Sequence, residues 1–310
     1  MQFNPVQQID IDAIERLVDL GLVIRKQYGD KTLYKYHNKV FYKNLWHTDP
    51  ILRECRGLVV QNGRVIQRPF HKMFNLNENR QGYPDSPFAV VEKVNGFMGA
   101  VSSHEGDMLY STTGTLDSDF VQLIENHVYD KLIRKIMKYP DYTFLFEVVD
   151  ESDPHIVEED IGLHLIGIRN KHTGIYVSLS GLQVFATDAT RLSSGDLIRM
   201  PKIRHMQTVG TVSALLTHCR GEGFAVWDYV MGCPVMKIKS PHYLSKKAMM
   251  RLGRNQINVM FDDPEEFRQR LDEEFYGIHN MLIREYTRDE YRELTEQQRR
   301  QLIEDYFYGK

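Results

Sequence analysis

The stretch Phe88-Ala89-Val90-Val91-Glu92-Lys93-Val94-Asn95-Gly96 gives the first indication of the fold. The apolar residues at its start predict a buried strand, and Asn95-Gly96 predicts a turn before a second apolar run at 97–101. Lys93 therefore stands at the end of a buried strand, where water reaches it poorly. Burial and nearby cations both lower the pKa of a lysine, so we expect a neutral, nucleophilic amine near pH 7. This stretch alone leaves a surface lysine beside a turn as the alternative.

Turn signals on both sides of this stretch predict a core built largely of β-hairpins. The strongest signal is Asn62-Gly63, which lies between two apolar runs. Further hairpins are predicted to turn at 104–107, at 170–174 (between strands 163–168 and 175–179) and at 231–232 (between strands 223–228 and 235–239). One helix interrupts the strands from about 118 to 138, because apolar residues recur there at helical spacing.

The sequence pattern changes near Pro241. The residues that follow are polar and show no strand alternation, and a helical stripe is formed by Phe267, Leu271, Phe275, Ile278 and Leu282. Thr295 with Gln298 resembles a capping box before a last helix. Another helix is predicted near the start of the chain, at 13–20. We therefore predict an α+β protein with a β-rich domain at 1–241 and a small all-helical domain at 242–310.

The composition of the 310 residues is typical of a globular protein. The net charge of −3 argues against a protein that coats nucleic acid, although a single cleft can still be positive. No apolar run approaches the roughly 20 residues of a membrane span, and the first ten residues lack a signal-peptide pattern, so no membrane contact is expected. Cys55, Cys219 and Cys233 are too scattered for a zinc site and indicate a reducing, cytoplasmic location.

Four further basic residues are candidate phosphate ligands. Arg56, in Glu54-Cys55-Arg56-Gly57, can grip a phosphate with its planar donor fork. Lys72 lies in an irregular stretch, 68–78, that mixes cations, aromatics and asparagines. Lys237 and Lys239 share one face of a strand, where like charges are tolerated in solvent or beside a shared anion such as a triphosphate. Exposure to solvent is the open alternative for all four.

Two carboxylates are candidate metal ligands. Glu147 interrupts the apolar strand 144–149, where a lone carboxylate is costly unless it is paired or bound to a metal. Glu222 lies between Gly221 and Gly223, which let backbone approach a ligand closely. A solvated strand face for Glu147 and an ordinary turn for Glu222 are the alternatives. Together with the cations and Lys93, these carboxylates supply the parts that nucleotidyl transfer needs.

In this order the motifs resemble the covalent nucleotidyltransferase superfamily of ligases and capping enzymes, and more narrowly the bacteriophage RNA ligase 1 family. Lys93-Val94-Asn95-Gly96 resembles the lysine motif usually written KxDG, and 68–78 is especially similar to the family. The remaining matches are Glu54–Gly57 with the upstream arginine motif, Phe146-Glu147 with motif III, Glu222-Gly223 with motif IV, and Lys237–Ser240 with motif V.

The resemblance implies an antiparallel-sheet, ATP-grasp-like ligase domain followed by a helical domain. It implies an ATP-dependent RNA ligase in which Lys93 forms a lysyl-AMP, the AMP passes to an RNA 5′-phosphate, and an RNA 3′-hydroxyl closes the bond. Lys93, Lys237 and Lys239 would be catalytic. The nucleotide would be bound by Arg56, Lys72, Glu147, Glu222, Lys237 and Lys239. Glu147 and Glu222 would hold Mg2+, with Mn2+ as an alternative ion.

The family further implies RNA as the partner, as single-stranded ends or nicked tRNA, and we expect a monomer, in the host cytoplasm if the chain is phage-encoded. Two departures stand out: Asn95 replaces the usual Asp, and 110–115 lacks the lysines common in that family segment.

Three alternatives were weighed. A DNA ligase or a capping guanylyltransferase usually carries an OB-fold after motif V, and the helical pattern after Ser240 argues against both. An inactive nucleic-acid-binding homologue is the third. The joint presence of the candidate catalytic lysines and carboxylates argues against it.

Overall fold

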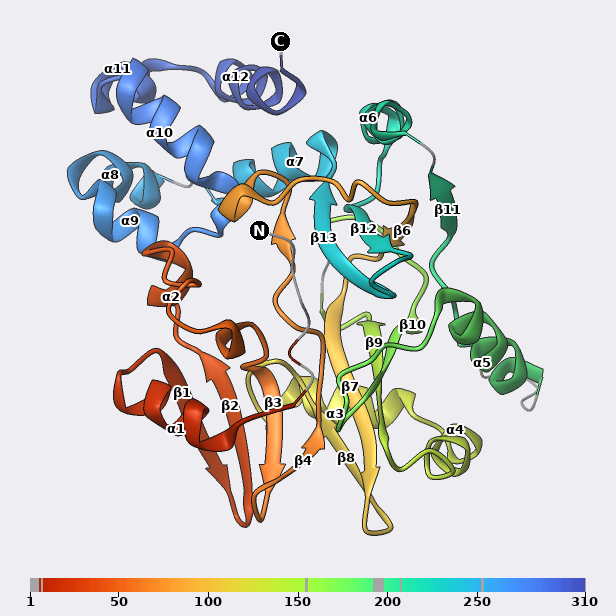
Figure 1. Cartoon of the computed structure of the whole chain (residues 1–310). Coiled ribbons are helices and arrows are strands. Elements are labelled where there is room, and N and C mark those ends of the chain that lie inside the picture. Colours follow the sequence, from red (N-terminus) through yellow and green to blue (C-terminus); the bar gives the residue numbers. More distant parts are fainter. Residues whose placement is uncertain are drawn as a thin grey trace.

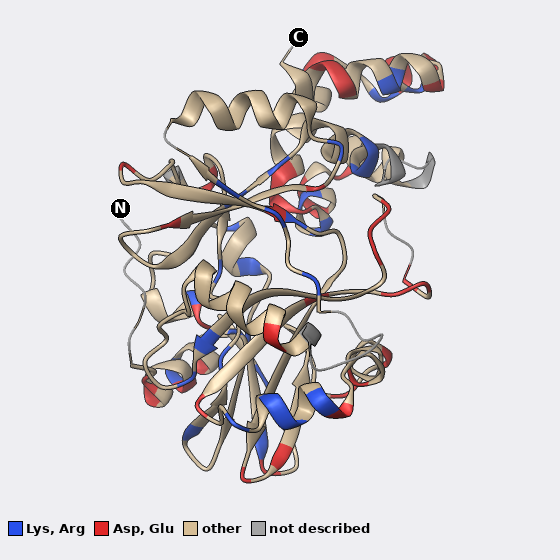
Figure 2. Cartoon of the chain, turned by 90° about the vertical axis from the view of Figure 1, so that its right-hand side faces the viewer, with Lys and Arg blue, Asp and Glu red and all other residues tan. Residues whose placement is uncertain are grey.

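The computed structural model describes residues 6, 8–153, 156–191, 198–206, 208–251 and 254–309. Its strands form three sheets, and the chain from Pro241 onward is helical (Figure 1). Lysine and arginine are interspersed with aspartate and glutamate along these elements, as expected from the nearly balanced charge (Figure 2). Within the described ranges, no helix has the length and hydrophobicity needed to cross a membrane.

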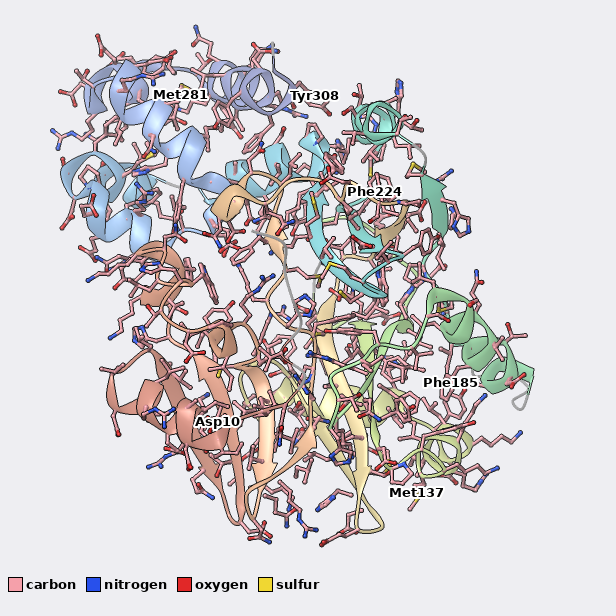
Figure 3. The ribbon with its side chains drawn as sticks, viewed as in Figure 1. Asp10, Met137, Phe185, Phe224, Met281 and Tyr308 are labelled. Atoms are coloured by element: carbon pink, nitrogen blue, oxygen red, sulfur yellow. The ribbon has the colours of Figure 1, made fainter. Side chains whose placement is uncertain are left out.

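The N-terminal sheet is antiparallel and has the strand order β1-β2-β3-β4. Its strands are β1 (Val23–Tyr28), β2 (Lys31–Tyr36), β3 (Arg56–Gln61) and β4 (Arg64–Gln67). Asn62 and Gly63 both have positive φ, 50° and 73°, which confirms the predicted hairpin between β3 and β4. The first predicted helix is α1 (Ile11–Asp19), and the side chain of Asp10 caps it by accepting a hydrogen bond from the Ala13 amide at 3.0 Å (Figure 3). A hydrophobic cluster of its own lies between α1 and this sheet.

The second sheet is antiparallel with the order β10-β9-β7-β8. Its strands are β7 (Phe97–His104), β8 (Asp107–Ser111), β9 (Tyr142–Val149) and β10 (Gly162–Asn170). The third sheet has the order β11-β6-β12-β13-β5, in which only the β13–β5 pair is parallel. Its strands are β5 (Phe74–Asn75), β6 (Phe88–Lys93), β11 (Ile203–Met206), β12 (Gly223–Asp228) and β13 (Cys233–Lys239). The hairpins predicted at 104–107 and 231–232 are confirmed as β7–β8 and β12–β13.

The second and third sheets share one large hydrophobic core. Val90 of β6, Ala100 of β7, Phe146 of β9 and Val226 of β12 are all fully buried in it. Helices α3, α4, α5 and α6 add apolar side chains to the same core. These sheets therefore hold the ends of β6, β9 and β12 in fixed relative positions.

Two predictions about this part of the chain are wrong, and two helices were missed. The helix predicted at 118–138 is two helices, α3 (Asp119–His127) and α4 (Asp130–Ile136), because Val128 and Tyr129 between them are extended. The strand predicted at 175–179 makes only a single bridge, from Arg169 to Tyr176, since the Tyr176 ring is stacked on Phe70 instead. Two helices that we did not predict are α5 (Leu179–Arg191) and α6 (Val209–His218). Their apolar faces complete the shared core, and the local sequence pattern does not predict these two helices.

Residues after Pro241 are helical, as predicted. The helices are α7 (Pro241–Arg251), α8 (Arg254–Asp262), α9 (Pro264–Arg270), α10 (Tyr276–Glu285), α11 (Arg288–Glu293) and α12 (Glu296–Tyr308), and a short 3-10 turn, η3 (Glu273–Phe275), precedes α10. Earlier in the chain lie the short helix α2 (Lys39–Tyr42) and the 3-10 turns η1 (Pro50–Arg53) and η2 (Glu78–Arg80). Thr295 caps α12 with the expected capping box. The predicted stripe is buried, but it is shared among α9, η3 and α10.

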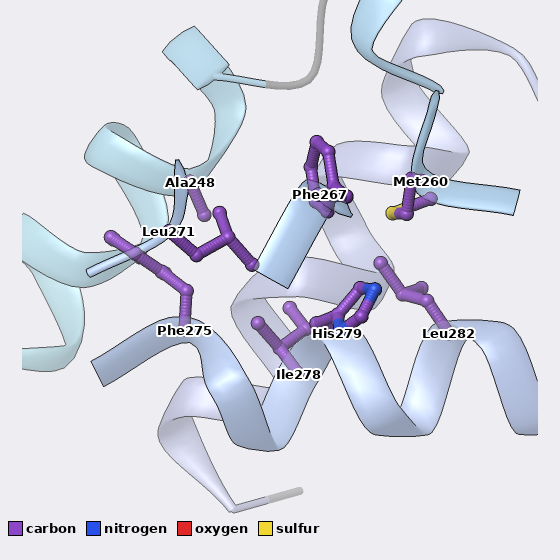
Figure 4. Close-up of a pocket in the computed structure, with 8 residues that line it drawn as sticks. All are labelled: Ala248, Met260, Phe267, Leu271, Phe275, Ile278, His279 and Leu282. Atoms are coloured by element: carbon purple, nitrogen blue, oxygen red, sulfur yellow. The ribbon is translucent and has the colours of Figure 1, made fainter. Parts of the chain in front are cut away.

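These C-terminal helices enclose a hydrophobic cluster of their own. Figure 4 shows a small pocket inside it, which is lined by His279 and by apolar side chains such as Phe267 and Leu282. Its lining offers no cluster of charges, so we regard it as packing space within the helical region. The boundary between domains at 241/242 stays a prediction, although α7 begins there.

Candidate active site

A polar cleft lies where the N-terminal sheet, β13 and the C-terminal helices meet, and it encloses about 990 Å³ of open space. Six basic side chains line it: Lys35, Arg56, Lys72, Lys237, Lys239 and Lys247. Three consecutive acidic residues also line it: Asp272, Glu273 and Glu274. The sequence analysis identified four of these cations and none of these acids.

Lys93 lies at the end of β6, paired in register with Gly223 at the start of β12. Its Nζ is 3.0 Å from Glu222 Oε2 and 3.7 Å from Glu147 Oε1. Burial lowers the pKa of Lys93, but the two carboxylates outweigh it, and the pKa lies above its ordinary value. The expected low pKa is therefore wrong for this state of the protein. Without a ligand, Lys93 is an ammonium ion at neutral pH.

The turn after Lys93 explains why glycine follows it. A Cβ on Gly96 would lie 2.3 Å from the carbonyl oxygen of Val148, so only glycine lets β7 begin this close to β9. The Gly96 amide also donates to Glu147 Oε1 at 3.3 Å. The lysine motif thus orients one of its own carboxylate partners.

Asn95 orients the other carboxylate. It is buried, and its Nδ2 donates to Glu222 Oε2 at 3.3 Å, while its Oδ1 accepts from the Val157 amide at 3.2 Å. An aspartate here would have no proton to donate and would place a second negative charge beside Glu222. The asparagine that departs from the usual motif therefore suits the carboxylate that it contacts.

Glu147 and Glu222 come from different sheets and converge on Lys93. Both are buried. Burial raises the pKa of Glu147, and nearby Glu222 adds to the effect in spite of Lys93. Glu222 also lies 3.6 Å from Lys239 Nζ, so it bridges two lysines. A Cβ on Gly223, which has φ 138°, would lie 2.0 Å from the Ile238 carbonyl oxygen, and this explains the glycine after Glu222.

Lys237 and Lys239 lie on one face of β13, as predicted, and Lys72 lies beside them. All three face carboxylates of η3. Lys72 Nζ is 2.5 Å and Lys237 Nζ is 3.7 Å from Glu273 Oε1. Lys239 Nζ is 2.5 Å from Glu274 Oε1, which also contacts Lys247 at 3.2 Å.

The crowding of these cations is visible in their electrostatics. Burial, Lys72 and Lys239 lower the pKa of Lys237 to about 8. Burial opposes the ionisation of Glu274, but Lys239 and Lys247 outweigh it and hold the pKa of this carboxyl well below its usual range. The acidic pair of η3 therefore neutralises a cluster of positive charge that is otherwise strongly repulsive.

The two arginines of the predicted ligand-binding stretches differ. Arg56, at the start of β3, faces the cleft, and Arg68 is completely buried. Arg68 Nε lies 3.1 Å from Glu54 Oε2, and Arg169 Nη2 lies 2.9 Å from Glu54 Oε1. This buried network fixes the chain just before Arg56. Of the cations in 68–78, Lys72 is the one that reaches the cleft.

The structure thus brings all the sequence-predicted site residues into one region. Lys93, Glu147, Glu222 and Lys239 form a continuous network, and Lys72 and Lys237 meet on Glu273. Sequence reasoning missed Lys35, Lys247 and the acidic pair. No local signal marks the pair, because consecutive glutamates usually indicate a solvated helical surface.

Comparison with known proteins places this region in a family. Residues 54–246, more than half of the chain, match the model of an RNA ligase family, and every motif described above falls within them. RNA ligase 1 of bacteriophage TS2126 is 29% identical over 160 residues, which cover 46% of this chain and 40% of that protein. A protein of Thermovibrio ammonificans, provisionally named an RNA ligase, is 27% identical over 212 residues, which cover 63% of this chain and 53% of that protein. The chain spans about half the length of these relatives.

A solved structure of an archaeal ATP-dependent RNA ligase has a TM-score of 0.61 and 16% sequence identity, and the match covers 97% of this chain and 77% of that one. At this identity the likeness shows the fold alone. It confirms the predicted fold, an antiparallel-sheet nucleotidyltransferase domain with a helical C-terminal region. The family match confirms the resemblance found in the sequence.

Proposed function

The chain belongs to the bacteriophage RNA ligase 1 family, and from that membership we propose that it is an ATP-dependent RNA ligase with Lys93 as its nucleophile. The observation that carries the proposal is the position of Lys93 between Glu147 and Glu222, with Lys239 bonded to the other oxygen of Glu222. This network joins a nucleophile to a row of cations. A nucleophile beside a phosphate-binding row is the arrangement that transfer of a nucleotidyl group requires.

In the first step, the neutral Lys93 amine attacks the α-phosphorus of ATP. The new bond is nitrogen to phosphorus, and the bond to the pyrophosphate oxygen breaks. Because the pKa of Lys93 is raised, the amine must first give up a proton, and Glu222 Oε2 at 3.0 Å is a described acceptor within hydrogen-bond reach. Asn95 and Gly96 hold Glu222 and Glu147 in place for this transfer.

The row of cations acts on the charge of the phosphates. Negative charge on the phosphate oxygens grows as pyrophosphate leaves, and fixed ammonium groups stabilise it. Lys237 and Lys239 lead from Lys93 toward Lys72 and Arg56, so we assign all four to the triphosphate. For this, Glu273 and Glu274 must leave the lysines that they contact.

The residues present fit a divalent cation held jointly with the nucleotide. Within the described ranges no three His, Cys, Asp or Glu side chains form a complete metal site. Mg2+ commonly takes only one or two protein carboxylates and completes its shell with phosphates and water. Glu147 and Glu222 are two such carboxylates; burial raises the pKa of Glu147, and the negative charge of nearby Glu222 adds to the effect. Mg2+ or Mn2+ there would offset that charge, lower the pKa of Lys93 and neutralise phosphate charge.

The remaining steps concern RNA. An RNA 5′-phosphate oxygen attacks the lysyl-AMP phosphorus and releases Lys93, and an RNA 3′-hydroxyl then attacks the 5′-phosphorus and releases AMP. We propose single-stranded RNA ends or nicked tRNA as substrates, on the strength of the family. We also propose a cytoplasmic location, since the cysteines are free thiols, two of them buried.

Incubation with α-labelled ATP and Mg2+ tests the proposal. We expect label that stays on the protein after denaturation and that passes to RNA with a 5′-phosphate. The same assay with α-labelled GTP, and sealing assays with matched RNA and DNA ends, separate this function from a capping enzyme and a DNA ligase. If neither nucleotide labels the protein, the proposed enzyme activity is wrong.

A further inference from the structure

Two cations of the cleft face each other across neighbouring strands. Lys35 of β2 pairs in register with Arg56 of β3. Like charges directly opposite each other in an antiparallel sheet repel, and a cross-strand pair normally places opposite charges or apolar groups there. The chain thus accepts a destabilising pair in the lining of a polar cleft.

No acidic side chain of the described residues forms a close ion pair with Lys35 or Arg56. Glu147 interacts with Arg56 through charge at longer range, and the side-chain hydrogen bond of Arg56 is donated to Met98 Sδ at 3.4 Å. Lys35 is half-buried, and burial together with nearby Lys26 lowers its pKa. A partly buried cation without a partner is costly unless a ligand completes its environment.

The loop that contains Thr113 and Gly114 lies next to Lys35, so a ligand bound there would contact it. Lys35 Nζ lies beside Gly114, where a Cβ would be 3.6 Å from it, and Thr113 lines the same cleft. Lys26 Nζ donates to the Gly114 carbonyl oxygen at 2.7 Å and ties this loop to the N-terminal sheet. Residues 110–115 carry no cation of their own, so the sheet supplies the positive charge here.

We propose that Lys35 and Arg56 together bind a phosphate group, in a subsite that adjoins the lysines that contact Glu273 and Glu274 in the same cleft. Lys35 belongs to the N-terminal sheet and lies outside the family-matched segment 54–246. That the phosphate belongs to a substrate rests on the proposed function. Two substrates carry such a group, the triphosphate of ATP and the 5′-phosphate region of RNA, and the experiment separates them.

The test compares Lys35→Met with Lys31→Met. Both variants exchange a lysine of β2 for methionine, but Lys31 pairs with Asp30 at the surface, away from the cleft. Self-labelling over a series of ATP concentrations reports on ATP, and sealing of pre-adenylated RNA reports on RNA alone. We expect Lys35→Met to weaken one of the two by roughly tenfold or more, because a hydrogen-bonded charge is lost, and the affected step identifies the source of the phosphate. Lys35→Arg should restore most of the loss.

A third measurement is independent of catalysis. Tripolyphosphate should bind the wild type and Lys31→Met alike, and should bind Lys35→Met roughly tenfold more weakly, as read from the concentration that raises Tm. Lys35→Met itself should melt no lower than the wild type, since it removes repulsion from Arg56; if that variant fails to fold, Lys35→Gln replaces it. Equal tripolyphosphate binding and equal rates in both assays would overturn the subsite. Absence of labelling in the wild type would overturn the proposed function instead, and tripolyphosphate binding would still decide the subsite.

Discussion

The cleft contains two groups of cations, and they differ in whether the protein itself supplies their counter-charge. Lys72, Lys237 and Lys239 pair with carboxylates from η3, whereas Lys35 and Arg56 form no close ion pair among the described residues. Buried or crowded cations need a counter-charge. In the first group the chain supplies it, and in the second group we expect a ligand to supply it. We therefore expect a phosphate ligand to compete with the C-terminal acidic pair at the first group and to bind without such competition at the second.

The largest effect is expected for Lys93→Ala, which separates binding from chemistry. Self-labelling should fall by about 10⁴-fold or more, because the nucleophile is gone. Both cation groups remain, so non-covalent binding of ATP, measured by calorimetry, should change little. Sealing of pre-adenylated RNA should also survive. Normal labelling by this variant would show that another residue is the nucleophile.

The second-largest effect is expected at the cations that pair with the η3 carboxylates. Lys237→Ala should slow self-labelling by roughly 100-fold, because a charge that stabilises the departing pyrophosphate is lost. The readout is the single-turnover rate at saturating ATP. Lys31→Met serves as the control for loss of a lysine outside the cleft. A rate equal to that of the wild type would show that Lys237 does not stabilise the departing pyrophosphate and is an ordinary solvated lysine.

The acidic pair itself gives the third prediction. The double variant Glu273→Gln with Glu274→Gln should lower the ATP concentration for half-maximal labelling by about tenfold, because ATP no longer displaces two carboxylates. The same variant should be less stable by about 3 kcal/mol in chemical denaturation, since buried lysines lose their partners. Labelling is therefore measured well below the Tm.

The matched control is Glu265→Gln with Glu266→Gln, on the exposed surface of α9. Glu266 contacts Arg270 there, outside the cleft. This control should alter neither ATP dependence nor stability appreciably. If the η3 variant needs as much ATP as the control does, the acidic pair does not compete with the nucleotide.

The smallest effect concerns pH. The pKa of Lys93 is raised, so its neutral fraction, and with it kcat/KM for labelling, should rise with pH through the neutral range. The pKa of Lys237 is about 8, so above that pH its charge is progressively lost and the rise should level off. Lys237→Arg stays charged, and its profile should continue to rise, separating from the wild type by a few-fold over about one pH unit. Profiles of identical shape would contradict this assignment of Lys237.

Features that depend on neighbouring residues were predictable from the sequence. Asn62-Gly63 forms its hairpin, Thr295 forms its capping box, and Lys237 and Lys239 share a strand face, since turn, cap and strand periodicity act over a few residues. The order of the motifs also identified the site and the family. Helices α5 and α6 were missed because their place depends on a core assembled from distant strands.

The sequence by itself determined which chemical groups gather at the proposed active site: Lys93, several further cations and two carboxylates. Only the tertiary structure decided their charge states and partners. Lys93 holds its proton because β9 and β12 deliver Glu147 and Glu222 to it, and Lys72 and Lys237 meet Glu273 from a segment far along the chain. Lys35 faces Arg56 through strand register alone. Electrostatic energy depends on distance in space, and separation along the chain does not reveal that distance.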